Sequence, residues 1–437
     1  MKIHFLNHAS VLFEYKNVRL LTDPWYFDTC FEGGWGLRYQ NPQALDLAAT
    51  ANYLWISHFH ADHFHVPTLK KLLALNPEIT VLGNHSYNFQ LDEAMRGIGF
   101  TNIIRFEERR PITIEEGITL TRYPTTGIDN MLHLKHEAFS ILNYNDCNIP
   151  PLSQKLLKRK IGAIDILMSN YNHAGKLLLY PYPNDETIRR KLIDSFSNNY
   201  KTFNPQYVLP YASHHYYRAS ESKHQNTSHI SGHELTRIDP KIINWRIGDV
   251  VIFDKHTNVL LVDDTDNKTA PTRPLDTLVH GPSETELELV RLSREYVKNL
   301  RRLYGPVAWF LPQLLINIAD LDVVMKLGTF TGLTLAEPGT EPQIVAHSSA
   351  LKKWWSKRYG TDSFVVGAHF ELVTKHRIPM YWQIILGILV DNKLDLKSIL
   401  TMLFRPRGIR FLVNRREEIL GILTSFQLAA SYQKQDD

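Results

Sequence analysis

One short segment near the N-terminus restricts the fold of this chain more than any other. Residues 53–56 read Tyr-Leu-Trp-Ile, and residues 57–63 continue as Ser-His-Phe-His-Ala-Asp-His. The first run is short and apolar, which is typical of a buried strand. Polar residues that follow such a strand directly lie at the end of a sheet, where several side chains can converge. The sequence therefore predicts a layered α/β fold with a polar site at a strand end.

The residue types in this segment indicate a metal site. Three histidines and one aspartate, His58, His60, Asp62 and His63, occur within six residues. Imidazole nitrogens and carboxylates are ligands that suit zinc, iron and manganese. Few thiolates are available, which argues against a closed structural zinc site. We expect one or two divalent ions here, zinc or iron, with manganese as a third option.

The rest of the chain shows strand and helix patterns in alternation. A hairpin is predicted around Lys16 and Asn17 and another around Lys255 and His256, and residues 67–75 have helical spacing after Pro67. The closely spaced glycines of residues 33–36 predict a loop. Residues 263–273 are polar and lack periodicity. We therefore expect a metal-binding domain over residues 1–265 and a mixed α/β accessory domain over residues 275–437.

An amphipathic helix is predicted over residues 284–303, with Ser283 as its N-terminal cap. The apolar run of residues 384–390 is too short to cross a membrane and predicts a buried helix. The N-terminus lacks the apolar stretch of a secretory signal. Together with only two cysteines, Cys30 and Cys147, this favours a cytoplasmic protein.

Residues 56–72 resemble the signature of the metallo-β-lactamase superfamily, and the resemblance extends over about residues 1–262. Within that superfamily the chain is similar to the metal-binding domain of the CMP-N-acetylneuraminate hydroxylase group. Residues 21–25 with the Gly-Gly-Trp loop, and residues 141–147, carry this similarity. Residues 7–10, Asn-His-Ala-Ser, resemble broader lactonase and N-acyl-phospholipase-D-like relatives. The resemblance implies an αββα sandwich.

The resemblance also implies a set of ligands. His58 and His60 would bind one metal, Asp62 and His63 the other, and Asp146 would bridge the two. Asp146 follows a predicted strand, which would bring it to the same sheet edge as the histidines. The alternative is that Asp146 caps the helix predicted from residue 152 onward.

Two ligand positions of the family pattern have no clear match. Near the first, the chain offers Thr125 and Asp129 but no histidine; Asp129 would supply a carboxylate in its place. For the last, His214 and His215 are preferred because they follow a predicted strand; the alternative is that they are loop histidines stacked with tyrosines. Three further groups belong to the expected surroundings: His85 lining the cavity, and His8 and Asp23 orienting ligands.

A metal site of this kind predicts a hydrolase that uses a metal-activated water on an ester, lactone, amide or phosphodiester. Asp62 or Asp146 would hold the nucleophile and move its proton. The alternative is a non-haem diiron oxygenase. It would need an external reductant, because Cys30 and Cys147 lack the spacing of a Rieske centre. The chain lacks a recognisable nucleic-acid-binding module.

The C-terminal part is basic. Residues 351–420 contain 13 Lys and Arg against 6 Asp and Glu, and residues 352–358 interleave four basic residues with two tryptophans. This pattern predicts contact with an anionic membrane surface, a carrier protein or a lipid-like anionic small-molecule substrate. The chain would then be a binding or docking module, even with a degenerate metal site. The alternative is a solvated helix face with buried tryptophans.

Overall fold

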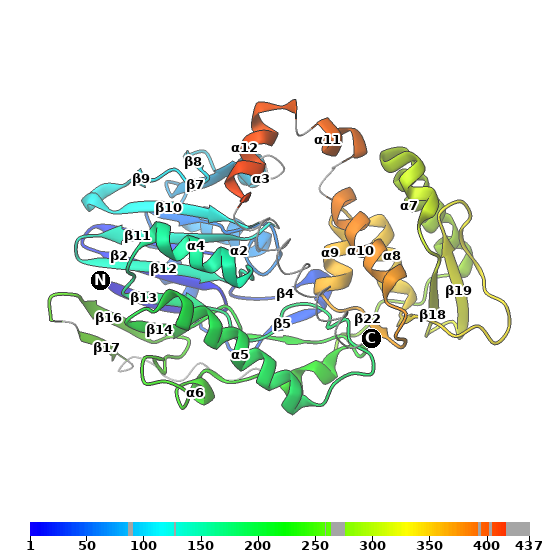
Figure 1. Cartoon of the computed structure of the whole chain (residues 1–437), viewed down its shortest axis with the longest axis horizontal. Coiled ribbons are helices and arrows are strands. Elements are labelled where there is room, and N and C mark those ends of the chain that lie inside the picture. Colours follow the sequence, from blue (N-terminus) through cyan, green and yellow to red (C-terminus); the bar gives the residue numbers. More distant parts are fainter. Residues whose placement is uncertain are drawn as a thin grey trace.

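Two sheets lie face to face in the N-terminal part, and helices cover their outer sides (Figure 1). The computed structural model describes residues 1–85, 91–125, 128–257, 259–263, 276–391, 395–401 and 404–416. The side chains of residues 84, 85 and 407 are outside the description. The expected domain boundary falls on residues 264–275, which lie outside the described residues, so the two proposed domain ranges stay a prediction.

The first sheet has eight strands in the order β17-β16-β1-β2-β3-β6-β7-β8. Both predicted hairpins are in it, because β2 pairs with β3 and β16 with β17, each antiparallel. From β3 to β8 the strands are parallel, so their carboxyl ends meet at one edge. The strands are β1 (Lys2–Asn7), β2 (Ser10–Tyr15), β3 (Val18–Thr22), β6 (Tyr53–Trp55), β7 (Thr80–His85), β8 (Ile103–Glu107), β16 (Val250–Asp254) and β17 (Val259–Asp263).

The second sheet has six strands in the order β14-β13-β12-β11-β10-β9. In β12, Phe139 and Ile141 pack into the core between the two sheets, whereas Leu142 and Tyr144 pack into the core under the outer helices. Successive side chains of a strand point to opposite faces, so an apolar strand such as this one is covered on both sides. The strands are β9 (Ile112–Thr113), β10 (Thr119–Pro124), β11 (Asn130–His136), β12 (Phe139–Asn145), β13 (Ile166–Ser169) and β14 (Tyr207–Pro210).

Helices on the two outer sides complete an αββα sandwich, as the resemblance implied. Leu69 and Leu72 of α2 pack with Leu21 and Leu54 of the first sheet. The helices α4 and α5 cover the second sheet in the same way. The helical elements here are α1 (Ala44–Ala49), α2 (Val66–Leu75), α3 (Leu91–Ile98), α4 (Pro151–Ile161), α5 (Asp185–Phe203), α6 (Gly232–Leu235) and the short 3-10 turns η2 (Glu115–Gly117) and η3 (Lys223–Ser228).

The glycine-rich segment is not a plain loop, and that prediction was wrong. A 3-10 turn η1 (Phe31–Gly33) is followed by β5 (Trp35–Leu37), which pairs with β4 (Thr29–Cys30) and with β15 (His215–Tyr217). A Cβ atom on Gly36 would lie 2.6 Å from the ring of Tyr216. Glycine is therefore required here by the close approach of a tyrosine ring and not by a turn.

The C-terminal part has a five-stranded sheet and a hydrophobic core of its own. Leu289 and Val297 of α7 pack with strand residues such as Ile316. The predicted helix is confirmed, but its cap is Thr285, whose side chain accepts a hydrogen bond from the Glu288 N–H, and not Ser283. The elements are α7 (Glu286–Tyr304), η4 (Gly305–Phe310), β18 (Leu314–Ile318), β19 (Val323–Gly328), β20 (Gly332–Leu335), β21 (Ile344–Ala346), α8 (Ser348–Ser356), α9 (Gly360–Val366), β22 (Phe370–Leu372), α10 (Ile378–Asp391), α11 (Leu396–Thr401) and α12 (Pro406–Asn414).

The C-terminal part packs against the sandwich near η1 (Figure 1). His369 Nε2 lies 2.7 Å from the Phe31 carbonyl oxygen, and the Lys176 N–H donates to the Val365 carbonyl at 3.0 Å. At the far end of α12, Arg415 returns to the sandwich and donates hydrogen bonds to Glu108 at 3.1 Å. The C-terminal part is thus fixed to the N-terminal sandwich at two places.

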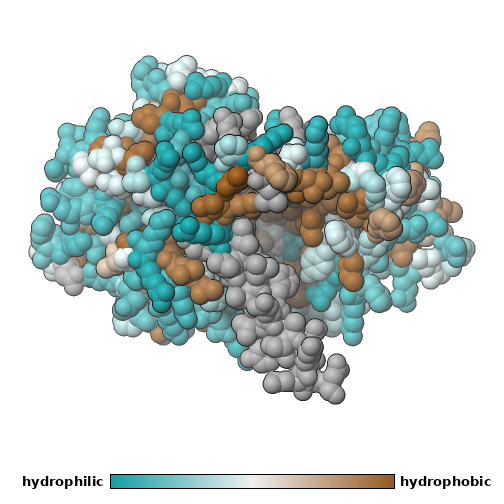
Figure 2. Space-filling model, turned by 45° about the horizontal axis from the view of Figure 1, so that its top comes forward, coloured by the Kyte–Doolittle hydropathy of each residue, from teal (hydrophilic) through white to brown (hydrophobic). Residues whose placement is uncertain are grey.

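The basic C-terminal segment buries its aromatic residues. Trp354 and Trp355 are 2% and 8% exposed within the C-terminal core, while Lys352 pairs with Glu284 at 2.9 Å. Apolar side chains gather instead across the face that carries α10 to α12 (Figure 2), and Trp382 on α10 is 41% exposed. Among the described residues, no helix is both long and apolar enough to span a bilayer. Contact with a membrane or carrier stays a prediction.

Candidate metal centre

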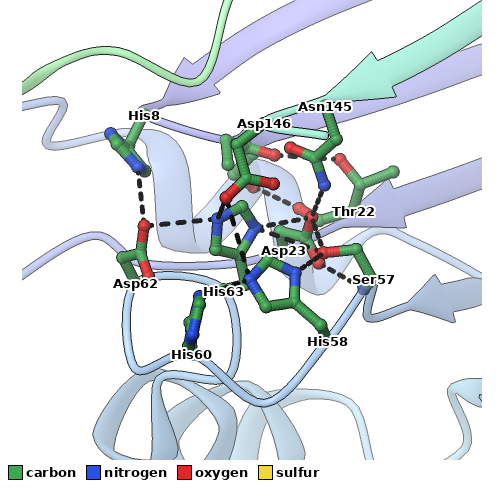
Figure 3. A network of polar contacts seen from close by, with 12 residues as sticks. His8, Thr22, Asp23, Ser57, His58, His60, Asp62, His63, Asn145 and Asp146 are labelled. Atoms are coloured by element: carbon green, nitrogen blue, oxygen red, sulfur yellow. Dashed lines mark hydrogen bonds and ion pairs between the residues drawn. The ribbon is translucent and has the colours of Figure 1, made fainter. Parts of the chain in front are cut away.

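The candidate site forms where the carboxyl ends of neighbouring strands meet (Figure 3). Asp23 follows β3 and Ser57 follows β6, and these two strands are adjacent and parallel. Asn145 and Asp146 lie at the end of β12 in the opposite sheet. The alternative for Asp146 as a helix cap is wrong, because α4 begins after Pro150 without a side-chain cap.

Asp23 organises the base of the site and is completely buried. Its Oδ1 accepts a hydrogen bond from the Ser57 N–H at 2.7 Å, and its Oδ2 accepts from Ser57 Oγ at 2.8 Å and from Asn145 Nδ2 at 2.9 Å. The same Oδ2 lies 3.0 Å from His63 Nδ1. One carboxylate therefore connects three segments of the chain and fixes the orientation of His63.

These contacts decide which ring nitrogens face the site. Because His63 Nδ1 donates to Asp23, its Nε2 faces the site, 3.2 Å from Asp62 and 3.4 Å from Asp146. His58 Nδ1 lies 2.9 Å from Ser57 Oγ, which leaves Nε2 facing His60 Nδ1 at 2.9 Å. This is the arrangement in which a second shell of hydrogen bonds orients metal ligands.

Two groups of side chains bring ligand atoms within 4.8 Å of one another, a spacing at which each could hold a metal ion. The first group contains His58, His60, Asp129 and Asp146. The second contains His8, Asp62 and His63. The structure thus brings together the histidine loop and Asp146, and it adds Asp129 at 3.6 Å from His58 Nε2.

The electrostatics of the site favour a positive charge. Burial disfavours a charged His63, but Asp62, Asp146 and Asp23 outweigh this effect and raise its pKa well above the ordinary value. Burial also opposes the ionisation of Asp146, yet the neighbouring His63 and His58 hold its pKa below the ordinary value. Burial lowers the pKa of His58, which therefore stays neutral with a lone pair available. The cluster has the charge pattern of a cation site.

His8 belongs to the second group by distance, but its hydrogen bonds indicate another role. The His214 backbone N–H donates to His8 Nδ1 at 3.2 Å. In the neutral ring of His8 the proton is therefore on Nε2, which lies 3.1 Å from Asp62 Oδ2. In this tautomer His8 orients the Asp62 carboxylate, which fits the role expected for it.

His214 and His215 are members of neither group. His214 precedes β15 and His215 is its first residue, so their side chains point in different directions. His214 lies against Phe5, with 5.0 Å between ring centroids, and His215 stacks on Trp35 at 3.8 Å. Packing against tyrosines is the alternative that the sequence left open, and His215 also lies edge-on to Tyr217, with 5.4 Å between ring centroids. A ligand role for His214 and His215 stays a prediction.

The other candidates have different positions. Thr125 Oγ1 is buried without a hydrogen-bond partner among the described residues, and the Thr125 N–H donates to the Asp129 carbonyl at 2.9 Å. The expectation that His85 lines the cavity falls on a side chain outside the described residues.

Two residues near the site were missed by sequence reasoning. Asn145 donates a hydrogen bond to Asp23 through its side-chain amide. Asp362 of α9 lies near His60: burial raises the pKa of Asp362, and the His60 ring lowers it in part. Asn145 could have been noticed because it precedes Asp146. Asp362 carried no signal, because about 300 residues separate it from the histidine loop.

Beside the candidate centre lies a second set of buried imidazoles, which we call the inner histidine cluster: His173, His215 and His229. The His229 ring lies 5.2 Å from that of His215 and 4.9 Å from that of His173. The His215 ring lies 5.5 Å from that of His8. Burial is the main reason that the pKa of each member is low, about 4 for His173. The three rings are therefore neutral.

Comparisons with known proteins agree with this geometry. Residues 2–212 match the family described as the Beta-lactamase superfamily domain. The cytidine monophosphate-N-acetylneuraminic acid hydroxylase of Pongo pygmaeus is 25% identical over 316 residues, which cover 65% of this chain and 51% of that protein. The chain thus spans about half the length of the curated relatives it matches.

Among solved structures, an isothiocyanate hydrolase from Delia radicum gut bacteria is 16% identical, with a TM-score of 0.42 over 58% of this chain and 100% of that one. A mutant of the CmlA beta-hydroxylase is 19% identical, with a TM-score of 0.38 over 48% of this chain and 46% of that one. The matched region, residues 2–212, contains the histidine loop and Asp146. The part of the chain that matches the beta-lactamase superfamily domain is therefore the part that carries the candidate metal centre.

Proposed function

We propose that the chain is a metal-dependent hydrolase that uses an activated water on an ester, lactone, amide or phosphodiester. One observation carries this proposal. His63 Nε2, Asp62 Oδ1 and Asp146 Oδ1 are buried without hydrogen-bond partners among the described residues, and these side chains converge (Figure 3). Buried polar atoms are normally paired. A divalent cation that displaces the Nε2 proton of His63 satisfies the imidazole nitrogen and two carboxylates at once.

The residues present fit one or two ions. His58 and His60 would hold one ion with Asp129, and Asp62 with His63 would hold the other. Asp146 Oδ2 lies 3.8 Å from His58 Nε2 and 3.4 Å from His63 Nε2, so it is placed to bridge the two positions. An ion bound there lowers the pKa of a coordinated water from 15.7 toward about 7 and polarises a substrate oxygen.

The chain's own groups supply orientation and proton transfer. Asp62 is fixed by His8, and His63 by Asp23, so neither ligand has to reorganise during turnover. Asp146 is ionised, because neighbouring imidazoles hold its pKa low, and its Oδ1 has no partner among the described residues. Asp146 Oδ1 is thus placed to accept a proton from a water and return it to the leaving group.

A diiron oxygenase is the second candidate. The observation that favours it is the carboxylate content of the site, since Asp62, Asp129 and Asp146 all take part in the two groups. Carboxylates together with histidines suit iron as well as zinc. The curated relatives include hydroxylases. An oxygenase reading requires an electron donor from outside the chain.

The deciding experiment measures metal content and then hydrolysis. Protein purified without added metal is analysed for zinc, iron and manganese, its visible spectrum is recorded, and a panel of esters, lactones and phosphodiesters is assayed before and after chelation. We expect bound zinc, loss of activity on chelation, and at least 100-fold loss in His63→Ala but not in the exposed-histidine control His256→Ala. Two irons with an oxo-bridge absorption would replace the hydrolase by the oxygenase. Absence of bound metal would defeat both and favour a docking module with a degenerate site.

A further inference from the structure

A cavity of about 650 Å³ lies beside the candidate metal centre, and its lining contains no member of the two groups that could hold a metal ion. It is lined by the segments that follow β5, β13 and β14, together with residues 229–234 and 244–247. Its size falls within the range typical of small-molecule sites. His214 joins it to the centre, because this residue lines the cavity while its backbone N–H donates to His8.

The polar wall of the cavity has unused hydrogen-bonding capacity. Arg38, His214 and His229 line it, and Arg38 Nη1, His214 Nδ1 and His229 Nε2 are each buried without a partner among the described residues. The Arg38 backbone N–H is fixed to the His214 carbonyl at 3.0 Å. Buried polar atoms rarely stay unpaired, so three of them on residues that line one cavity favour a ligand that accepts hydrogen bonds.

The charges around the cavity favour an anion. Arg38 makes no ion pair among the described residues, whereas Arg246 pairs with Asp249 at 3.7 Å. The one carboxylate of the lining, Glu234, is bound to Arg189 and accepts from the Ser231 N–H at 2.7 Å. The uncompensated charge is therefore the positive charge of Arg38.

The cavity also has an aromatic lining, and two of its tyrosines lie next to His214. Tyr39, Tyr171 and Trp245 line the cavity. Trp245 is held by its Nε1 donating to the Pro210 carbonyl at 2.8 Å and by stacking on Phe5 with 4.4 Å between ring centroids. Fixed aromatic surfaces of this kind bind flat or apolar bodies at low entropic cost.

We propose that this cavity is a binding site for a ring-bearing organic oxyanion, either a carboxylate or a phosphate monoester. Arg38, with His214 and His229, binds the oxyanion through charge-assisted and neutral hydrogen bonds. Tyr39 and Trp245 pack against the ring. The site goes beyond the proposed hydrolase function, because its residues are distinct from both groups that could hold a metal ion and its occupancy does not require an ion. It assigns His214 to the oxyanion in place of the ligand role predicted from the sequence.

The test is isothermal titration calorimetry on the full chain with phenyl phosphate, benzoate, inorganic phosphate and the neutral analogue benzyl alcohol. We expect saturable binding of at least one ring-bearing anion, and the tighter of the two identifies the oxyanion. Inorganic phosphate and benzyl alcohol should each bind at least 10-fold more weakly. If benzyl alcohol bound as tightly as the anions, the proposed binding of an oxyanion by Arg38 would be wrong. If inorganic phosphate bound as tightly, the proposed packing of a ring against Tyr39 and Trp245 would be wrong.

Variants separate this cavity from the metal centre. Arg38→Gln should weaken anion binding about 10–100-fold, whereas Arg302→Gln, an exposed arginine on α7, should not change it. His229→Gln provides a second lining variant if thermal denaturation shows that Arg38→Gln is unfolded. Binding should survive in His58→Ala. Binding lost in His58→Ala but kept in both lining variants would assign the anion to the metal centre and overturn the proposal, without bearing on the hydrolase.

Discussion

Two clusters of buried histidines lie next to each other in this protein, and they differ in their partners. His58 and His63 of the candidate metal centre are surrounded by Asp23, Asp62 and Asp146. The inner histidine cluster has aromatic and hydroxyl partners instead: His173 Nδ1 lies 2.9 Å from Tyr217 Oη and its Nε2 lies 3.2 Å from Ser228 Oγ. The proposed metal ligands include three histidines, and the inner histidine cluster also has three. The two clusters therefore differ in their carboxylates.

The partners set opposite charge preferences. Burial lowers the pKa of a histidine in both clusters, but at His63 three carboxylates outweigh it and the pKa rises. At His173, His215 and His229 nothing outweighs burial, and the rings stay neutral. A cation is therefore favoured at the first cluster and disfavoured at the second. We conclude that convergence of carboxylates, and not histidine content, locates a metal site in this fold.

The largest expected effect comes from removing the bridging carboxylate. Asp146→Asn keeps the shape of the side chain but removes the negative charge shared between the two positions. We expect at least one ion to be lost or bound more than 100-fold more weakly, measured by titration with zinc under chelator competition. Asp194→Asn, on the exposed face of α5, is the matched control and should bind like the wild type. Equal affinity in both variants would remove Asp146 from the site.

A smaller effect is expected from the carboxylate behind the ligands. Asp23→Asn removes the acceptor that orients His63 without removing a ligand, so metal affinity should fall about 10–100-fold. Asp165→Asn is a suitable control, because Asp165 accepts from the Ser140 N–H at 2.7 Å in the same sandwich but away from the site. If the control lost metal to the same extent, the effect of Asp23 would be one of general stability.

The inner histidine cluster should make the free energy of unfolding depend on pH. His173 has a pKa of about 4 in the folded chain against about 6.5 when unfolded. The unfolded state therefore binds more protons below pH 6.5, and the free energy of unfolding falls as the pH drops from about 6.5 to 4. His173 alone should contribute about 2–3 kcal/mol to this loss. Urea unfolding of wild type and His173→Gln at pH 7 and 4.5 checks it; identical pH dependence would contradict a buried neutral His173.

The smallest expected effect concerns the stacking of His215 on Trp35. Trp35→Phe keeps an aromatic ring but reduces the stacked area, so the free energy of unfolding should fall by about 1 kcal/mol. Metal content should not change. Trp309→Phe, whose tryptophan is 55% exposed, should stay within about 0.5 kcal/mol of the wild type. Loss of metal in Trp35→Phe would show that the two clusters are not independent.

The sequence predicted the parts of the site that depend on local order. A buried strand leading into the histidine loop fixes where those residues lie, and the end of β12 does the same for Asp146. The αββα sandwich was predicted from resemblance. These features follow from strand patterns and from a motif within a few residues, which a single sequence displays.

The predictions that were wrong or left open concern features that depend on tertiary contacts. Gly36 lies in a strand because β5 pairs with β4 and β15, and it is a glycine because the ring of Tyr216 leaves no room for a Cβ atom. The sequence shows neither contact. Neighbouring side chains such as His214 and His215 point in different directions, and which one faces the site depends on how β15 pairs. The helix cap is Thr285 and not the predicted Ser283. This shift of two residues is within the usual uncertainty of helix ends.

The most direct test is the metal content of protein purified without added metal, compared among wild type and two double variants. The wild type should contain one or two ions per chain. His58→Ala with His63→Ala, which removes one ligand from each metal position, should contain none. His173→Gln with His229→Gln should keep the wild-type amount if it remains folded by circular dichroism. Metal retained in the first variant, or lost only in the folded second variant, would contradict the assignment of the metal site to the carboxylate-rich cluster.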